Sequence, residues 1–547
     1  MMSTELLANG LSELPNEILL RIFTLVVCEE SQSSSYAQAP APAWVLSIPH
    51  VCSRWRTLAL GSPTLWTRIT SYFHFFWYNV HLERAHDTPL HPIVPLLDAD
   101  DIPDEGLLEN MARASCEMDI ILQPGPLSPQ DDDEEEDDEG DAYFVWCLGD
   151  DAPRLQTLSI EQPSSTVPLE LPHPFSNNHD SLRHLSITCP SLEIPNWTTN
   201  LFTNLTSLTI HSTVNFSVLR AICRKATKLE RLAYSAPSPR GKKLNIKEPF
   251  IRDERPLVMP SLHELSMSSF DQRDSESFLA ALELPALERL YLRLRVTSAS
   301  SKAAVQLVED LTPLLRSFAD PTHVEFLIHD DKRVAFVLGR SPIDVPSVVI
   351  VFDLIEKLDV LALFPRLLSH FALDSVRTLG LADATLKGEL YEASVWRELL
   401  QPFKGVTELW CMQATHQITY SSELLSALWP GQWAPYTLPA ETEGELILPS
   451  LRRMNFTRRP VRFAGLREPG AVAVHEQWPS DPDEPHPFEL LRLADRIGRL
   501  SDAKRAVEYV FEDVEGMEGK VREMLRRGEG REVEVVTGSR VVSLKAA

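Results

Sequence analysis

Residues 182–187 read LRHLSI, and the spacing of their apolar residues recurs along the middle of the chain. Each copy has an apolar residue, two further residues, a second apolar residue, one further residue and a third apolar residue. Successive side chains of a strand point to opposite faces, so the last two apolar residues of a copy lie on one face of a short strand. The pattern predicts a series of short strands that each bury one face.

The copies are spaced closely enough to stack. The other clear copies begin at Leu155, Leu205, Leu229, Leu262 and Leu287. Counted from Leu155, the first residues of the successive copies lie 27, 23, 24, 33 and 25 residues apart. One copy cannot bury an apolar face alone, whereas stacked copies share a continuous core. Weaker copies begin at Val376, Val406 and Leu451, so we expect insertions or a distorted array after Leu287.

The array resembles irregular leucine-rich repeats, whose period is about 20–29 residues. The asparagine of regular families is absent, and Pro163, Pro190 and Thr213 stand in its place. The resemblance implies an α/β fold with a leucine-rich-repeat-like solenoid over residues 142–470. We expect residues 471–547 to form a helical and stranded cap, with helices over residues 487–527. The residues leave open a mixed α/β domain with scattered leucine-rich strands.

A second feature is the apolar helix near the start of the chain, where residues 11–27 read LSELPNEILLRIFTLVV. Pro15 suits the first helical position and Glu17 the first turn. Residues 18–27 are apolar on nearly every side and carry one charge, at Arg21. A surface helix needs only one apolar stripe. We therefore expect a second apolar face that is buried in its own domain or against a partner.

A second helix is predicted over residues 48–60, which read IPHVCSRWRTLAL. Its apolar residues recur at three- and four-residue steps, which gives one apolar face. Residues 29–43, between the two helices, are rich in Ser, Ala and Pro and predict a flexible insertion. The sequence SPTLW follows at residues 62–66.

LPNEILLRIF, VCSRWRTLAL and SPTLW together resemble the F-box, in the form common among fungal F-box proteins. The resemblance implies that residues 11–70 form a small helical bundle. It also implies docking on a Skp-type adaptor and, through it, on the cullin scaffold of a ubiquitin ligase. The residues implied in adaptor contact are Leu14, Pro15, Ile18, Leu19, Ile22, Phe23, Val51, Cys52, Trp55 and Leu58. The alternative is that these residues are the plain core of a helical pair.

Residues 71–141 are expected to connect the F-box to the repeats. Within them, residues 131–141 form an acidic run that we interpret as a solvated linker, because like charges repel and prevent packing. A docking strip for a basic partner is the other reading. Residues 72–78 read YFHFFWY and predict a buried strand, with a membrane or ligand patch as the alternative.

Composition limits the possible partners and the compartment. The net charge of −26 argues against nucleic acid and membrane surfaces as partners. Seven cysteines without paired spacing indicate free thiols in a reducing compartment. No signal peptide is visible, and no apolar run reaches the roughly 18–20 residues that span a bilayer. We expect a cytoplasmic or nuclear protein.

Motifs of enzymes, cofactor sites and metal sites are missing from the sequence, which contains no HExxH, no GxGxxG and no GxSxG. We therefore expect no catalysis, no cofactor and no metal. The leading hypothesis is a substrate-recognition adaptor of an SCF-type ubiquitin ligase. A repeat scaffold without ligase coupling is the second hypothesis and an enzyme is the third. An unknown target protein would meet strand residues beside the buried ones: Thr157, Ser159, His184, Ser186, Ser207, Thr209, Arg231, Glu264, Ser266, Arg289 and Tyr291.

Overall fold

The computed structural model divides the chain into two compact units, Met1–Ile246 and Lys247–Ala547. The described residues are 14–31, 41–70, 73–96, 111, 113–122, 152–162, 169–170, 180–193, 200–214, 216–236, 256–269, 278–296, 309, 311–318, 320–330, 333–340, 345–354, 366–383, 393–412, 448–457, 508–512 and 541–545. Within these ranges no helix combines the length and the apolar character that a membrane crossing requires.

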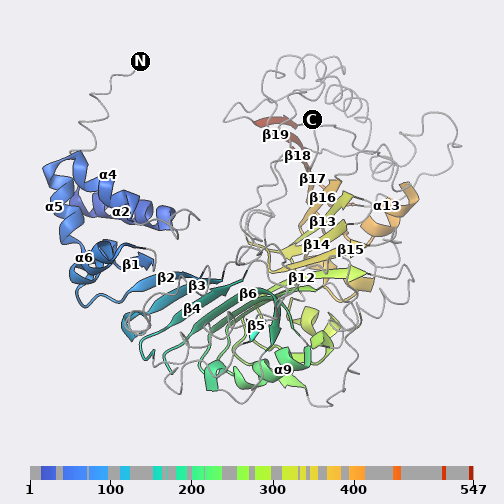
Figure 1. Cartoon of the computed structure of the whole chain (residues 1–547). Coiled ribbons are helices and arrows are strands. Elements are labelled where there is room, and N and C mark those ends of the chain that lie inside the picture. Colours follow the sequence, from blue (N-terminus) through green and yellow to red (C-terminus); the bar gives the residue numbers. More distant parts are fainter. Residues whose placement is uncertain are drawn as a thin grey trace, which may run out of the picture. The chain divides into compact units, whose positions relative to one another are not determined.

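The first unit opens with a helical domain (Figure 1). Its elements are α2 (Asn16–Ser31), α4 (Ala43–Val51), α5 (Ser53–Gly61) and the 3-10 turn η1 (Pro63–Trp66). The prediction of one helix over residues 48–60 is wrong, because Cys52 has extended backbone between α4 and α5. The Cys52 Sγ then caps α5 by accepting a hydrogen bond from the N–H of Trp55, at 3.4 Å. Pro49 lies inside α4 rather than at a helix start.

The insertion between the first two helices is shorter than residues 29–43. The helix α2 continues to Ser31, and α4 begins at Ala43. The Glu30 carboxylate accepts hydrogen bonds from the backbone N–H groups of Ala43, at 2.6 Å, and Trp44, at 2.8 Å. One side chain at the end of α2 therefore holds the start of α4, where a helix has unsatisfied N–H groups.

The aromatic stretch at residues 72–78 is not the predicted strand. Phe75–Ala85 forms helix α6, and the His74 ring caps it by accepting from the N–H of Phe76. Phe73 and Tyr78 are buried, whereas Phe76 is exposed. Phe76 and Tyr78 are two positions apart within α6, so their side chains lie on different sides of the helix.

The sheet of the first unit is parallel and follows chain order (Figure 1). Its strands are β1 (Arg68–Thr70), β2 (His91–Leu96), β3 (Glu117–Leu122), β4 (Thr157–Glu161), β6 (His184–Glu193), β7 (Ser207–Thr213) and β8 (Arg231–Ser235). The short β5 (Leu169–Glu170) pairs with the end of β6. Helix α9 (Phe216–Lys225) lies between β7 and β8 in the chain. The sheet begins at Arg68, so residues 71–141 contribute two strands and are not the simple connection we expected.

The repeated apolar residues stack in register across this sheet. Leu185 stands beside Leu208, and Ile187 stands beside Ile210, with all four side chains buried. The turns before the strands stack as well. For example, the carbonyl of Arg183 accepts from the N–H groups of both Thr206 and Ser207 in the next copy. Identical spacing in successive copies thus produces one shared apolar face.

The sheet of the second unit is mixed. Its strands, in spatial order, are β10 (Glu264–Ser269), β12 (Arg289–Val296), β15 (Val348–Leu354), β14 (Arg333–Gly339), β13 (His323–Asp330), β16 (Thr378–Asp383), β17 (Glu408–Met412), β18 (Arg453–Thr457), β19 (Glu508–Glu512) and β20 (Val541–Lys545). Strands β9 (Leu257–Val258) and β11 (Leu282–Glu283) form a separate pair. Helix α13 (Ala393–Leu400) precedes β17.

The expected distortion after Leu287 is a three-strand meander, β13–β14–β15, placed in reverse order between β12 and β16 (Figure 1). Residues 334–338 and 348–352 are buried on both sides of these strands. Continuous apolar runs suit strands that are covered on both faces. One of the two faces carries the cluster Leu327, Ala335, Val337, Val349 and Val351, against which Tyr291 packs.

The described part of the C-terminal region contains two strands. Residues 508–512 form β19, where we predicted a helix, and β20 pairs antiparallel with it. The other helices predicted over residues 487–527 lie outside the described residues, as does the acidic run at residues 131–141.

Candidate functional site

Helix α2 has two apolar faces with different surroundings. Leu19, Phe23 and Val27 recur at four-residue steps and are buried. Phe23 packs edge-on against Trp55 of α5, with ring centroids 4.9 Å apart. This face forms the core of the helical domain.

The other face of α2 is a stripe formed by Ile18, Ile22, Leu25 and Val26. Ile18 is 44% exposed and Leu25 62% exposed, whereas Ile22 is half-buried. Positions i, i+4, i+7 and i+8 lie on one side of a helix. The surplus apolar surface that we expected on this helix is therefore present in the first unit. We call these four residues the α2 stripe.

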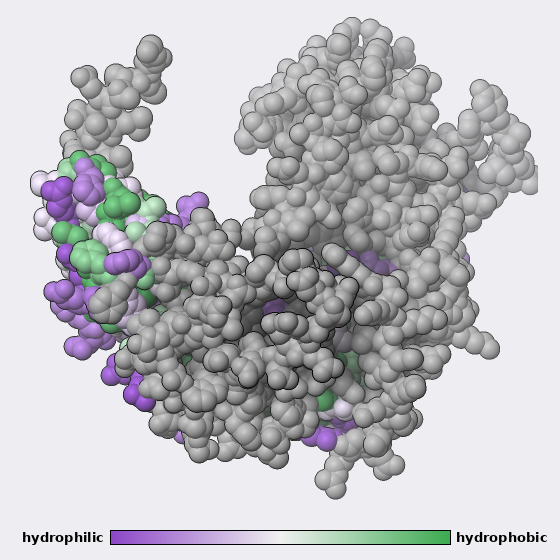
Figure 2. Space-filling model, in the orientation of Figure 1, coloured by the Kyte–Doolittle hydropathy of each residue, from purple (hydrophilic) through white to green (hydrophobic). Residues whose placement is uncertain are grey.

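Helix α4 also exposes apolar side chains, since Leu46 is 61% and Val51 60% exposed. Figure 2 shows apolar surface over the helices of this domain. Single exposed apolar residues are common, but several on two neighbouring helices indicate a contact surface.

The residues predicted to contact an adaptor separate into three groups. Leu19 and Phe23 are core residues, so their inclusion in a docking surface is wrong. The exposed residues are Pro15, Ile18, Val51 and Cys52. The half-buried residues are Leu14, Ile22, Trp55 and Leu58. Sequence reasoning missed Leu25 and Val26 of α2 and Leu46 of α4. The seven-residue step from Ile18 to Leu25 could have shown that these two residues share a face of α2.

Arg54 joins the two ends of the helical domain. Its guanidinium donates to the Asn16 Oδ1, at 2.7 Å from Nη2, and also to the carbonyl of Leu14. The start of α2 is thereby held against α5.

An aromatic core lies where the helical domain meets the sheet. Trp66 packs edge-on against Trp44 of α4, at 4.8 Å, and against the His81 ring of α6, at 5.0 Å. The guanidinium of Arg84 lies 4.8 Å from the Trp66 ring centroid. Since Trp66 ends η1 and β1 begins at Arg68, the helical domain and the first strand share this core.

The face of the first sheet opposite the buried leucines carries most of the residues predicted to meet a target. Thr157, Ser159, His184, Ser186, Ser207 and Thr209 are all half-exposed, and Arg231 is exposed. Strand register places Thr157, His184, Ser207 and Arg231 in one row across β4, β6, β7 and β8. The structure therefore brings these residues together on one polar face.

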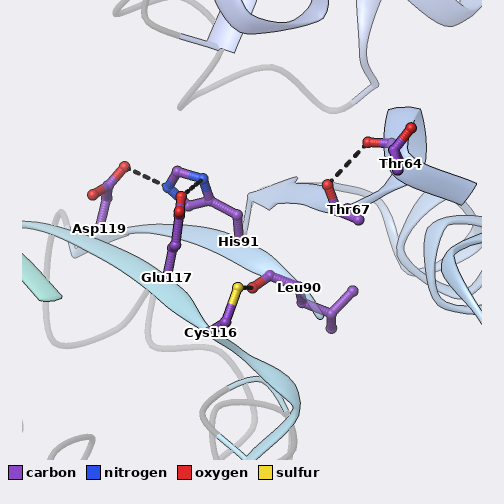
Figure 3. A network of polar contacts seen from close by, with 7 residues as sticks. All are labelled: Thr64, Thr67, Leu90, His91, Cys116, Glu117 and Asp119. Carbon is purple, nitrogen blue, oxygen red and sulfur yellow. Dashed lines mark hydrogen bonds and ion pairs between the residues drawn. The ribbon is translucent and has the colours of Figure 1, made fainter. Parts of the chain in front are cut away.

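The same face holds an ionic network at β2 and β3 (Figure 3). His91 places its Nδ1 3.1 Å from a Glu117 oxygen and its Nε2 2.8 Å from an Asp119 oxygen. Sequence reasoning missed this network, because residues 91 and 117 become neighbours only when β2 pairs with β3. One imidazole therefore bridges the two carboxylates.

The predicted target-contact residues of the second unit have different surroundings. Arg289 is exposed and pairs with the Glu264 carboxylate on β10, at 3.8 Å. Ser266 is half-exposed and stands beside Tyr291 in register. Tyr291 packs against the apolar cluster of the meander described above, so its side chain contributes to the core of the second unit.

The described residues contain no group of three His, Cys, Asp or Glu side chains that could hold a metal ion. Burial raises the pKa of the Cys189 thiol to about 11 and that of Cys223 to about 12. Both thiols therefore stay protonated near neutral pH, where a thiolate would be needed for nucleophilic chemistry.

Residues 11–71 match the F-box-like family model. The helical domain described above, called the box from here on, occupies this range. A search of solved structures found a chain from the crystal structure of a TLR13–ssRNA13 complex. The identity is 13% and the TM-score 0.30, over 64% of this chain and 40% of that chain. This chain thus spans less than half the length of that one. The comparison with curated proteins found no match.

Proposed function

We propose that this protein is a substrate receptor of an SCF-type ubiquitin ligase. F-box domains generally bind Skp1-type adaptors, and the match over residues 11–71 supports the same role here. The box would dock the adaptor, and the adaptor would connect it to a cullin scaffold. The polar face of the first sheet would hold a target protein.

The observation that carries this proposal is the α2 stripe. The box already has a complete core in Leu19, Phe23 and Val27. The second apolar stripe on the same helix leaves Ile18, Leu25 and Val26 exposed. Burial of apolar area contributes roughly 25 cal/mol per Å², so covering the stripe with a partner would stabilise the complex. With Leu46 and Val51 of α4, the surface suits a partner with an apolar face of its own.

The repeats support the second half of the proposal. Copies of the apolar pattern stack in register, and turn carbonyls accept from equivalent N–H groups of the next copy. We infer from this stacking that the body is an irregular leucine-rich-repeat solenoid. It would act without chemistry of its own, by holding a target near a ligase that performs the transfer. Such tethering raises effective concentration.

A binding measurement with purified Skp1-type adaptor tests the proposal. Leu25→Asp with Val26→Asp places two charges on the α2 stripe and should abolish adaptor binding by the full chain. The matched control is Val258→Asp with Val345→Asp, which alters exposed valines of the second unit and should bind normally. Unchanged binding by the stripe variant, with a folded box by hydrogen exchange, would refute adaptor docking through α2. Absence of binding by the unaltered chain would instead leave a repeat scaffold without ligase coupling.

A further inference from the structure

The edge of the first sheet where the strands begin is rich in cations. Arg154 directly precedes Leu155, the first apolar residue of the β4 copy. Lys228 directly precedes Leu229, the first apolar residue of the β8 copy. Arg183 follows that residue in the copy of β6, and Arg231 opens β8. We call Arg154, Arg183, Lys228 and Arg231 the basic strip.

The members of the basic strip come from stacked copies. Ser181 donates to the carbonyl of Pro153, at 2.6 Å, which joins the turns before β4 and β6. The Lys228 Nζ donates to the Asn204 Oδ1, at 2.7 Å, which joins the turns before β7 and β8. These contacts place the four cationic residues along one edge of the sheet.

The positive charges of the strip are not neutralised by carboxylates among the described residues. Arg183 donates to the backbone carbonyls of Asp180, at 2.7 Å, and Leu182. Lys228 has a neutral amide oxygen as its partner. Arg154 and Arg231 are exposed and form no ion pair within the described part of the chain. The acidic residues near these turns are Asp180 and Glu230 within the described residues, and Asp150 and Asp151 precede Arg154 in the sequence.

The second unit shows what a neutralised arrangement looks like. Arg289 stands in register with Glu264 on the neighbouring strand, and Arg453 with Glu408. Both arginines pair with those carboxylates, at 3.8 and 4.0 Å. On β7, the neighbouring strand of the first unit, the residue in register with Arg231 is Ser207. The first sheet therefore leaves its strand-start cations available, in a chain whose net charge is −26.

We propose that the basic strip binds an acidic, Asp- and Glu-rich segment of the target protein. This rests on the proposed function and adds the chemistry of the target. Strands lie about 4.8 Å apart, so the three steps from β4 to β8 span about 15 Å, the length of roughly five extended residues. Ser and Thr hydroxyls of the adjacent face would receive the rest of the segment. The negative charge of the whole chain disfavours long polyanions such as nucleic acid, because they extend beyond the strip.

The test uses the full chain and a fluorescent peptide of about eight residues that alternates Glu with Ser, with a Gln-for-Glu peptide as the neutral reference. Arg154→Ser with Arg231→Ser removes two unpaired cations of the strip. Arg289→Ser with Arg453→Ser removes two paired ones and changes the net charge equally. We expect the dissociation constant to rise about fivefold for the first variant and less than about twofold for the second. Binding should also weaken when the salt concentration rises from about 50 to 300 mM, because the screening length shortens and the attraction between the charges falls.

Two further arms separate the alternatives. A chain in which the carboxylates of residues 131–139 are changed to amides is measured in parallel, since that acidic run lies in the same chain and can compete for the strip. The proposal is overturned if neither the unaltered chain nor the amide-substituted chain binds the Glu peptide more tightly than the Gln peptide. It is also overturned if both arginine variants lose affinity for the Glu peptide equally. Tighter, strip-dependent binding of an RNA oligomer of equal charge would also overturn it. Adaptor binding by the Arg154→Ser with Arg231→Ser chain is measured alongside, so that failure here is distinguished from failure of the proposed function.

Discussion

The imidazole of His81 hydrogen-bonds through Nδ1 to the backbone carbonyl of Trp66, at 3.0 Å. A carbonyl only accepts, so in this geometry Nδ1 carries the proton and Nε2 is the basic nitrogen. The His81 Nε2 is buried without a hydrogen-bond partner among the described residues. The core shared by the box and the first strand therefore contains a neutral imidazole.

This geometry predicts acid sensitivity of the box. Burial, together with the nearby Arg84 charge, lowers the pKa of His81 from 6.5 to about 4. In the folded state the ring thus stays neutral at pH values where the unfolded chain is protonated. Stability is fully present above about pH 6.5 and falls as pH drops toward 4, by about 3 kcal/mol in all.

Hydrogen exchange of the box and β1 at pH 7, 5.5 and 4.5 measures this loss. The variant His81→Phe keeps an aromatic ring and cannot be protonated. The stability of its box should therefore depend less on pH across the same range. An equally steep profile in that variant would assign the acid sensitivity to another group.

The two faces of α2 should respond differently to truncation. Phe23→Ala empties a core position and should destabilise the box by about 3–5 kcal/mol. Leu25→Ala removes an exposed side chain and should change its stability by less than about 0.5 kcal/mol. Urea titration followed by hydrogen exchange of α2 and α5 compares them. Similar losses in both variants would contradict the assignment of the faces.

Removal of the Glu30 carboxylate should destabilise the start of α4 more than removal of the neighbouring Glu29 carboxylate. Glu30→Ala removes the acceptor of two N–H groups at the start of α4 and should cost about 1 kcal/mol, as loss of a helix cap does. The adjacent Glu29 is exposed, and Glu29→Ala serves as the control. Amide exchange of residues 43–51 should accelerate in the first variant alone; acceleration in both would point to a general charge effect.

Gly405 has no space for a side chain. A Cβ at this position would lie 2.5 Å from the Arg377 Nη1 and 2.8 Å from the Asp374 carbonyl oxygen. Gly405→Ala should therefore destabilise the second unit by about 1–3 kcal/mol. Gly61→Ala, where no atom lies within 4 Å of the new Cβ, should be tolerated. Chemical denaturation of both variants gives the comparison, and equal stability would show that the Arg377 turn relaxes freely.

Sequence reasoning worked best where a pattern is local and repeated. The apolar spacing around Leu185 and Leu208 predicted strands that the structure stacks in register. It failed where a neighbour distant in sequence decides the outcome. The aromatic residues 72–78 suit a strand by propensity, yet residues 75–78 begin α6, where Tyr78 is buried and Phe76 is not. The His91–Glu117 pair likewise depends on strand pairing.

The sequence by itself determined that the first helix has more apolar surface than one stripe, and that the repeated pattern forms short strands with one buried face each. Both conclusions follow from the periodicity of side chains along a single element. Only the tertiary structure decided that Phe23 is buried while Leu25 is exposed, and that a meander interrupts the second sheet. It also decided that Arg231 stands beside Ser207 of β7, and that Arg289 pairs with Glu264 of β10. The physical reason is that burial and charge pairing depend on which elements become neighbours, and periodicity within one element does not contain that information.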